Sequence, residues 1–141
     1  MDPVVERRVD LEATPDDVWR ALTESEELAS WFGPEAELDA QPGGHGRFVD
    51  DDGCVRRAVV DQVRTGERLV LRWWPEGDEP GAGASVVTFA LTPSGSGTRL
   101  VVTERLPATG ASLRAAADAA RTAWMWRLDV LMLRVAALVR V

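Results

Sequence analysis

Lysine and tyrosine are absent from this chain of 141 residues, which holds one cysteine and one histidine. The single cysteine, Cys54, excludes a disulfide framework within the chain. The single histidine, His45, excludes a pair of histidine ligands for a metal ion. Since lysine is missing, all 16 basic residues are arginine. A GC-rich coding genome produces that bias without functional pressure, so we draw no functional conclusion from it.

Charge and hydropathy argue against two further classes of protein. The net charge of −7 disfavours nucleic-acid binding, because phosphate contacts need a basic surface. No apolar run reaches the roughly 18 residues of a membrane span, since Arg127, Asp129 and Arg134 interrupt the most hydrophobic segment. The first residues, which include Arg7 and Arg8, lack the apolar core of a signal peptide. We therefore expect a cytoplasmic protein with neither nucleic acid nor membrane as a partner.

The strongest pattern lies in residues 111–141, which contain neither proline nor glycine. Apolar side chains recur there in steps of three and four, at Leu113, Ala117, Ala120, Trp124, Leu128, Leu131, Val135 and Leu138. This spacing predicts one apolar stripe along a helix of about 28 residues, about 40 Å long. Because there is no repeat and no long linker, we expect a single domain over residues 1–141.

The segments before this helix predict strands, with two short helices after the first strand. Thr14 and Pro15 are a helix cap and a first helical residue, and a second short helix is expected from Ser25 to Gly33. Strands are expected at residues 4–11, 46–50, 54–63, 67–74, 85–92 and 98–104. Short turns between them predict an antiparallel meander covered on one face by the long helix, which is an α+β fold.

Several of these segments resemble the activator-of-Hsp90-ATPase-like (AHSA1-like) branch of the START-like, or SRPBCC, superfamily. The similar segments are residues 14–23, 28–32, 43–48, 67–73, 87–91 and 97–100. The resemblance implies a β-α-α-β6-α helix-grip fold. In that fold a curved antiparallel sheet wraps around the long C-terminal helix and leaves a cavity between them.

The resemblance also implies a range of functions. Relatives include binders of small hydrophobic ligands, polyketide cyclases or aromatases, self-sacrificing resistance proteins and co-chaperone domains, so the fold does not fix the activity. We expect a bacterial protein of stress response or secondary metabolism that binds a small hydrophobic or aromatic molecule. The expectation includes no catalytic residue, metal or other cofactor. The alternatives are a cyclase- or dehydratase-like enzyme and a co-chaperone-like interaction domain.

The candidate ligand site consists of side chains predicted to face the space between sheet and helix. Its residues are Trp31, Phe32, Phe48, Trp73, Phe89, Trp124, Arg127, Leu128 and Leu131. Many apolar walls with few polar anchors are typical of small-molecule pockets, but the same side chains can instead fill a core. Arg127, beside the apolar stripe, must pair with a carboxylate, extend to solvent, or anchor a ligand carboxylate or phenolate.

Other polar residues are weaker candidates for chemistry. Arg134 has the same three alternatives as Arg127. Glu104, Asp61 and Arg57 on the strands are further polar partners, and the pattern does not decide which face of the sheet they occupy.

Three more features near the turns are expected to have no chemical role. We interpret His45 as a solvated loop residue and Cys54 as an inert thiol. Asp50, Asp51 and Asp52 lack the spacing of a calcium loop, and we expect a solvated hairpin tip there.

A second apolar flank of the long helix would remain uncovered if only the main stripe were buried. Its residues are Trp126, Val130, Leu133 and Ala137. Leaving these side chains in water forgoes several kcal/mol at ~25 cal/mol per Å² of apolar area. We expect them to pack within the domain, with a homodimer as the alternative.

Overall fold

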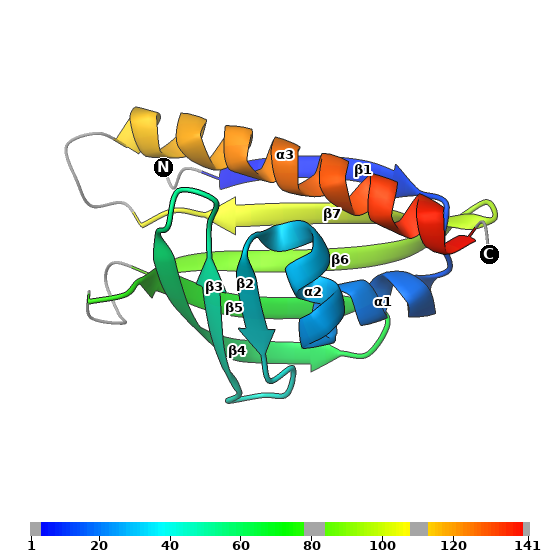
Figure 1. Ribbon diagram of the computed structural model, residues 1–141, viewed down its shortest axis with the longest axis horizontal. Helices are drawn as coiled ribbons and strands as arrows, with labels where there is room; N and C mark the ends of the chain where they lie inside the picture. The colour runs from blue at the N-terminus through cyan, green and yellow to red at the C-terminus, as the bar shows by residue number, and fades with distance from the viewer. Residues whose placement is uncertain (1–3, 78–83, 108–112, 140–141) are drawn as a thin grey trace.

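A curved, seven-stranded antiparallel sheet carries three helices on one face (Figure 1). The computed structural model describes residues 4–77, 84–107 and 113–139. The elements in chain order are β1 (Val4–Leu11), α1 (Pro15–Thr23), α2 (Ser25–Phe32), β2 (Glu35–Leu38), β3 (His45–Val49), β4 (Val55–Arg64), β5 (Arg68–Pro75), β6 (Ser85–Ser94), β7 (Gly97–Arg105) and α3 (Leu113–Val139). The predicted β-α-α-β6-α order and α+β class are confirmed.

The sheet has the strand order β1-β7-β6-β5-β4-β3-β2, so every strand except β1 pairs with its neighbour in sequence. β1 instead crosses to β7, with Val5 opposite Glu104. In Figure 1, α3 runs along β1 and β7, while β2 and β3 turn over in front of the sheet beside α2. α3 packs most closely on β1 and α2.

The two short helices begin and dock as their sequences indicate. The Oγ1 of Thr14 accepts a hydrogen bond from the backbone N–H of Asp17, and Pro15 occupies the first helical turn. The indole N–H of Trp31 donates to the carbonyl of Ala21 at 2.8 Å, which fixes α2 against α1. Phe32 then ends α2 with its ring buried against the sheet.

Strand β2 was not expected from the residue pattern. Its four residues place only Ala36 and Leu38 inward, which is too short an alternation to predict a strand. β2 pairs with β3, where a Cβ at Gly46 would lie 2.9 Å from a methyl carbon of Leu38. Glycine at this position therefore lets the strand pass close to the Leu38 side chain.

The core lies between the concave face of the sheet and α3. Alternate residues of β5 and β6 are buried there, as predicted, and the described members of the α3 stripe face them. The buried stripe comprises Ala117, Trp124, Leu128, Leu131 and Val135. The side chains of Leu113 and Leu138, the two ends of the predicted stripe, lie outside the described residues.

The expectation that the second flank of α3 packs within the domain is wrong for its described side chains, and the side chain of Ala137 lies outside them. Trp126 is 63% exposed, Val130 41% and Leu133 74%. Trp126 lies about 160° around the helix from Leu128 at 100° per residue, so it points away from the sheet. Among the described residues, no helix is long and apolar enough to cross a membrane.

Candidate functional site

The predicted site residues bring five aromatic rings together beneath the sheet. Trp73 of β5 stacks on Trp124 of α3, with ring centroids 5.6 Å apart and planes 12° from parallel. Phe32 at the end of α2 meets both indoles edge to face. Phe48 packs on Phe32 and Trp73, and Phe89 packs on Trp124. Five of the predicted site residues thus lie together, and their contact with a ligand stays a prediction.

The rings fill the space that they share. The void bordered by Phe32, Phe48, Trp73 and Phe89 measures about 10 Å³, which is about the space of one water molecule. Its remaining borders are aliphatic side chains from the two short helices and the sheet. An organic ligand has no room in this part of the interior.

A buried carboxylate joins the two stacked indoles. Glu104 of β7 is 5% exposed. Its Oε2 accepts from the Trp73 indole N–H at 3.1 Å, and its Oε1 accepts from the Trp124 indole N–H at 2.8 Å. Each carboxylate oxygen keeps a further lone pair. Glu104 thus faces inward, whereas Asp61 and Arg57 are exposed on the other face of the sheet.

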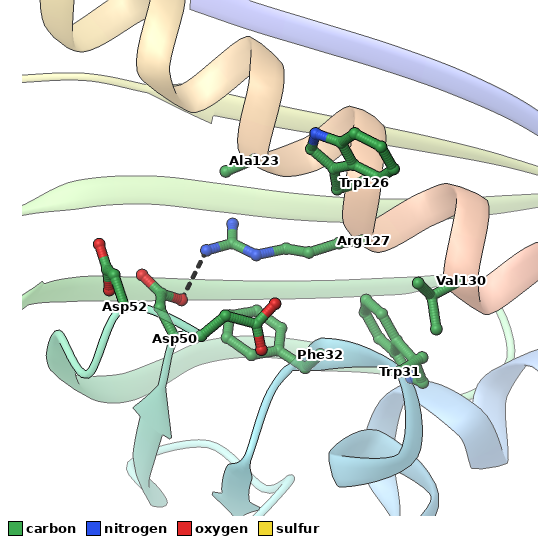
Figure 2. A pocket seen from close by; sticks show the side chains of 9 residues that line it. Trp31, Phe32, Asp50, Asp52, Ala123, Trp126, Arg127 and Val130 are labelled. Carbon is green, nitrogen blue, oxygen red and sulfur yellow. Dashed lines mark hydrogen bonds and ion pairs between the residues drawn. The ribbon is translucent and has the colours of Figure 1, made fainter.

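Arg127 crosses from α3 to the β3–β4 hairpin (Figure 2). Its Nη2 lies 2.8 Å from Oδ1 of Asp50, and its guanidinium carbon lies 4.3 Å from the Phe32 ring centroid and 4.7 Å from that of Trp124. Arg56 of β4 pairs with the other carboxylate oxygen of Asp50. Of the three alternatives for Arg127, pairing with a carboxylate is therefore the one observed.

The burial of this ion pair sets its electrostatics. Removal from water lowers the pKa of Arg127, and the neighbouring Asp50 carboxylate opposes that shift. Asp50 was expected at a solvated hairpin tip, and that interpretation is wrong because its side chain is largely buried between two arginines. Asp51 and Asp52 are exposed, as expected.

Two openings lie on either side of Arg127, which lines both of them together with Ala123. We call the first the α2-side cleft. It measures about 270 Å³, and its other walls are Trp31, Phe32, Asp50, Asp51, Asp52, Trp126 and Val130. Figure 2 shows this cleft from close by. We call the second the α3 groove. It measures about 320 Å³, and it runs between the N-terminal half of α3 and the ends of β5, β6 and β7.

The α3 groove combines apolar walls with charged groups, of which Glu104 and Arg127 are buried. Its apolar side is formed by Trp73, Trp74, Pro75, Leu106, Pro107, Ala116, Ala119, Ala120 and Ala123. Its charged groups are Glu104, Arg56 and Arg127. Trp74 and Arg56 were not predicted as site residues. The tandem tryptophans at 73–74 were the available signal, but strand alternation suggested that only Trp73 faces inward.

The remaining predicted site residues divide among these spaces. Trp31 and Phe32 line the α2-side cleft, Trp73 lines the α3 groove, and Phe48 and Phe89 border the small void. Trp124, Leu128 and Leu131 line none of these three spaces.

The polar residues outside the site have simple surroundings. His45, Cys54 and Arg134 are exposed, and the nearest oxygen of Glu27 is 3.9 Å from Nη2 of Arg134. Asp52 accepts a hydrogen bond from the backbone N–H of Cys54, which lowers the pKa of Asp52. The Asp52 carboxylate in turn raises the pKa of the Cys54 thiol. In the described part of the chain, no group of three or more His, Cys, Asp or Glu side chains has a metal-binding arrangement.

The sequence and the fold identify the family. Residues 12–133 match the family described as activator of Hsp90 ATPase homolog 1-like protein. This chain belongs to the AHSA1-like family. No curated protein matches the sequence significantly.

Solved structures share the AHSA1-like fold. MLL2253 from Mesorhizobium loti is 26% identical, with a TM-score of 0.80 over 92% of this chain and 94% of that one. DynU16, from the dynemicin biosynthetic locus, is 28% identical with a TM-score of 0.77 over 94% of this chain, which spans 46% of DynU16. The Aha1 dimer from Colwellia psychrerythraea is 18% identical, with a TM-score of 0.77 over 94% of this chain and 96% of that one.

Proposed function

We propose that this protein binds a small, flat and largely apolar molecule in the α3 groove. The observation that carries the proposal is the combination of a groove of about 320 Å³ with two tryptophans and buried polar groups in its walls. Binding sites for small molecules usually measure about 300–1,000 Å³, so this groove suits a ligand of few rings. Ligand contacts with Trp73 and Arg127 are part of this proposal, as are contacts with Trp31 and Phe32 for a ligand that extends past Arg127.

The charges around the groove favour an uncharged ligand. Arg56 and Arg127 carry two positive charges, and Asp50 and Glu104 carry two negative charges close by. A charged ligand would have to lose its hydration without a free counter-ion, which is costly. A neutral ligand with a hydroxyl group can instead donate to a free lone pair of Glu104 while its ring packs on Trp73 or Trp74.

A cyclase-like enzyme is the second candidate function. The observation in its favour is that Glu104 and Arg127 both line the groove, where a carboxylate could accept a proton from a bound substrate. The similarity to DynU16 supports a role in secondary metabolism for either candidate. For the co-chaperone alternative, the family membership is the support.

Binding can be tested with three probes of one shape and different charge: 2-naphthol, 2-naphthoate and 2-naphthylmethylammonium. Titration followed by the NMR signals of the tryptophan indole N–H groups should give the strongest binding for 2-naphthol, with shifts at Trp73 and Trp74. The variant Ala116→Phe should weaken binding by obstructing the groove. The matched control is Ala115→Phe, on an exposed neighbour that does not line the groove.

Two results would contradict the proposal. One is the absence of binding by all three probes. The other is equal binding by the Ala116→Phe and Ala115→Phe variants, which would move the site elsewhere. Tighter binding of either charged probe would leave the groove as the site and refute the preference for a neutral ligand.

A further inference from the structure

The exposed flank of α3 has the residue spacing of a coiled-coil seam. Ala119, Ala123, Trp126, Val130 and Leu133 follow one another in steps of four, three, four and three. This is the alternation of a and d positions in a heptad, with Ala123 and Val130 at a and the other three at d. The buried stripe of α3 uses the opposite side of the helix, so the domain's own packing does not explain the second seam. Ala119 and Ala123, at the N-terminal end of the seam, also line the α3 groove, so the seam and the groove share these two residues.

The large side chains of this seam are open to solvent. Trp126 and Leu133 are the two most exposed large apolar residues of the described chain. Val130 lies between them on the same face and is also exposed. A contiguous apolar strip of this kind marks an interaction surface more often than isolated exposed residues do.

Two charged residues border the seam in a pattern that specifies a partner. Asp129 occupies a g position and Arg134 the following e position, five residues later. Residues five apart do not face each other on one helix, so Asp129 and Arg134 of the same α3 do not interact with each other. Between two parallel helices in register, however, a g residue meets the e residue five positions further along the partner.

Both charges are available for such a contact. Asp129 is exposed and makes no ion pair among the described residues. Arg134 is exposed, and its closest carboxylate oxygen, on Glu27, lies at 3.9 Å. That distance is the long limit of an ion pair, so Arg134 can turn to a partner at little cost.

We propose that the partner of this flank is a second copy of the chain, with the two α3 helices parallel around a two-fold axis. The symmetry makes Asp129 of each copy face Arg134 of the other, which gives two equivalent ion pairs. An antiparallel arrangement would set e against e and g against g, and neither ion pair would form. The charges therefore favour the parallel dimer over the antiparallel one.

The contact is short, and this sets the expected affinity. The described seam covers two heptads, about 21 Å of helix, with three large apolar side chains from each copy. Stable dimers usually bury more surface than one pair of helices of this length provides. We therefore expect a concentration-dependent equilibrium between monomer and dimer.

Sedimentation equilibrium over a wide range of protein concentration tests the interface. Leu133→Glu should raise the dimer Kd by about tenfold or more, because two carboxylates would enter an apolar seam. Met125→Glu is the matched control, since Met125 is exposed on α3 outside the seam and should leave Kd unchanged. A chain that stays monomeric at every concentration, or a dimer unaffected by Leu133→Glu, would overturn the proposal.

Charge exchange tests the parallel register. Asp129→Arg and Arg134→Asp should each weaken the dimer by about three- to tenfold, because each creates two like-charge contacts. The double variant carrying both changes should recover the original Kd, since the ion pairs then form with reversed polarity. If the free-energy losses of dimerisation from the two single variants simply add in the double variant, the helices are not parallel in this register. Circular dichroism of each variant checks that the monomer remains folded.

Discussion

The packed interior and the α3 groove share Trp73, yet they differ in what surrounds it. On one side Trp73 meets Phe32, Phe48 and Trp124, and the remaining void is about 10 Å³. On the other side small alanines of α3 leave about 320 Å³ open. The size of the facing residues, and not the number of aromatic rings, therefore decides whether the space is core or groove.

The first prediction concerns two tryptophans on α3 that differ in burial. Trp124→Ala should lower the free energy of unfolding by about 3–5 kcal/mol, because it removes a buried ring and the hydrogen bond to Glu104. Trp126→Ala should change it by less than about 0.5 kcal/mol. Urea denaturation at a protein concentration where the chain is monomeric measures both values. Similar losses for the two variants would mean that the flank is covered within the monomer.

The second prediction concerns the ion pair that separates the groove from the α2-side cleft. Asp50→Ala should cost about 3 kcal/mol, since it leaves the buried Arg127 without a carboxylate. Arg127→Met should cost about 1 kcal/mol, because an apolar side chain of similar length replaces the charge and Asp50 keeps Arg56. Thermal and urea denaturation give the two free energies. If Arg127→Met lowers the free energy of unfolding more than Asp50→Ala does, the contacts of the guanidinium with the aromatic rings contribute more than its ion pair with Asp50.

The third prediction concerns the carboxylate at the base of the groove. Glu104→Gln should cost about 1–3 kcal/mol, because the two indole N–H groups donate to different oxygens. The amide nitrogen that replaces one of these oxygens cannot accept, so one donor is left unsatisfied. Asp61→Asn is the control on the exposed face of the sheet and should have little effect. Urea denaturation gives the stability, and the indole N–H signals of Trp73 and Trp124 show which hydrogen bond is lost. Unchanged signals would mean that Glu104 does not hold the two rings.

The fold was largely predictable because its signals are periodic. The apolar stripe around Trp124 and the alternation in β5 and β6 each repeat over several residues, and turns rich in glycine and aspartate separate the strands. β2 was missed from the residue pattern because four residues show too little alternation. Only the family resemblance implied a seventh strand.

The candidate site was less predictable because it depends on contacts between distant segments. The position of Arg127 beside the apolar stripe indicated a partly buried charge. No residue near it in the sequence indicated that its carboxylate partner would be Asp50, 77 residues away. Asp50 also lies beside two exposed aspartates, Asp51 and Asp52, so the sequence gives no sign that its side chain is less exposed than theirs. Small residues such as Ala116 and Ala120 create the groove, and an alanine in a helix gives no signal of the space beside it.

The smallest expected effect lies at the hairpin tip, where Asp52 is exposed although Asp50 is partly buried. The Asp52 carboxylate raises the pKa of Cys54, so less thiolate is present near neutral pH and the thiol reacts slowly. Asp52→Asn should therefore increase the rate of reaction of Cys54 with a disulfide reagent, whereas Asp51→Asn should not. In the same hairpin the pKa of Asp52 is lowered, so its carboxyl should titrate below the usual range for aspartate and remain charged as the pH falls through that range. The rates in urea, where the two variants should react equally, serve as the reference. If Asp52→Asn and Asp51→Asn also react at equal rates in the native state, Asp52 and Cys54 do not interact. Asp52 would then be a solvated residue without an influence on Cys54, as the sequence pattern predicts for all three aspartates of the hairpin tip.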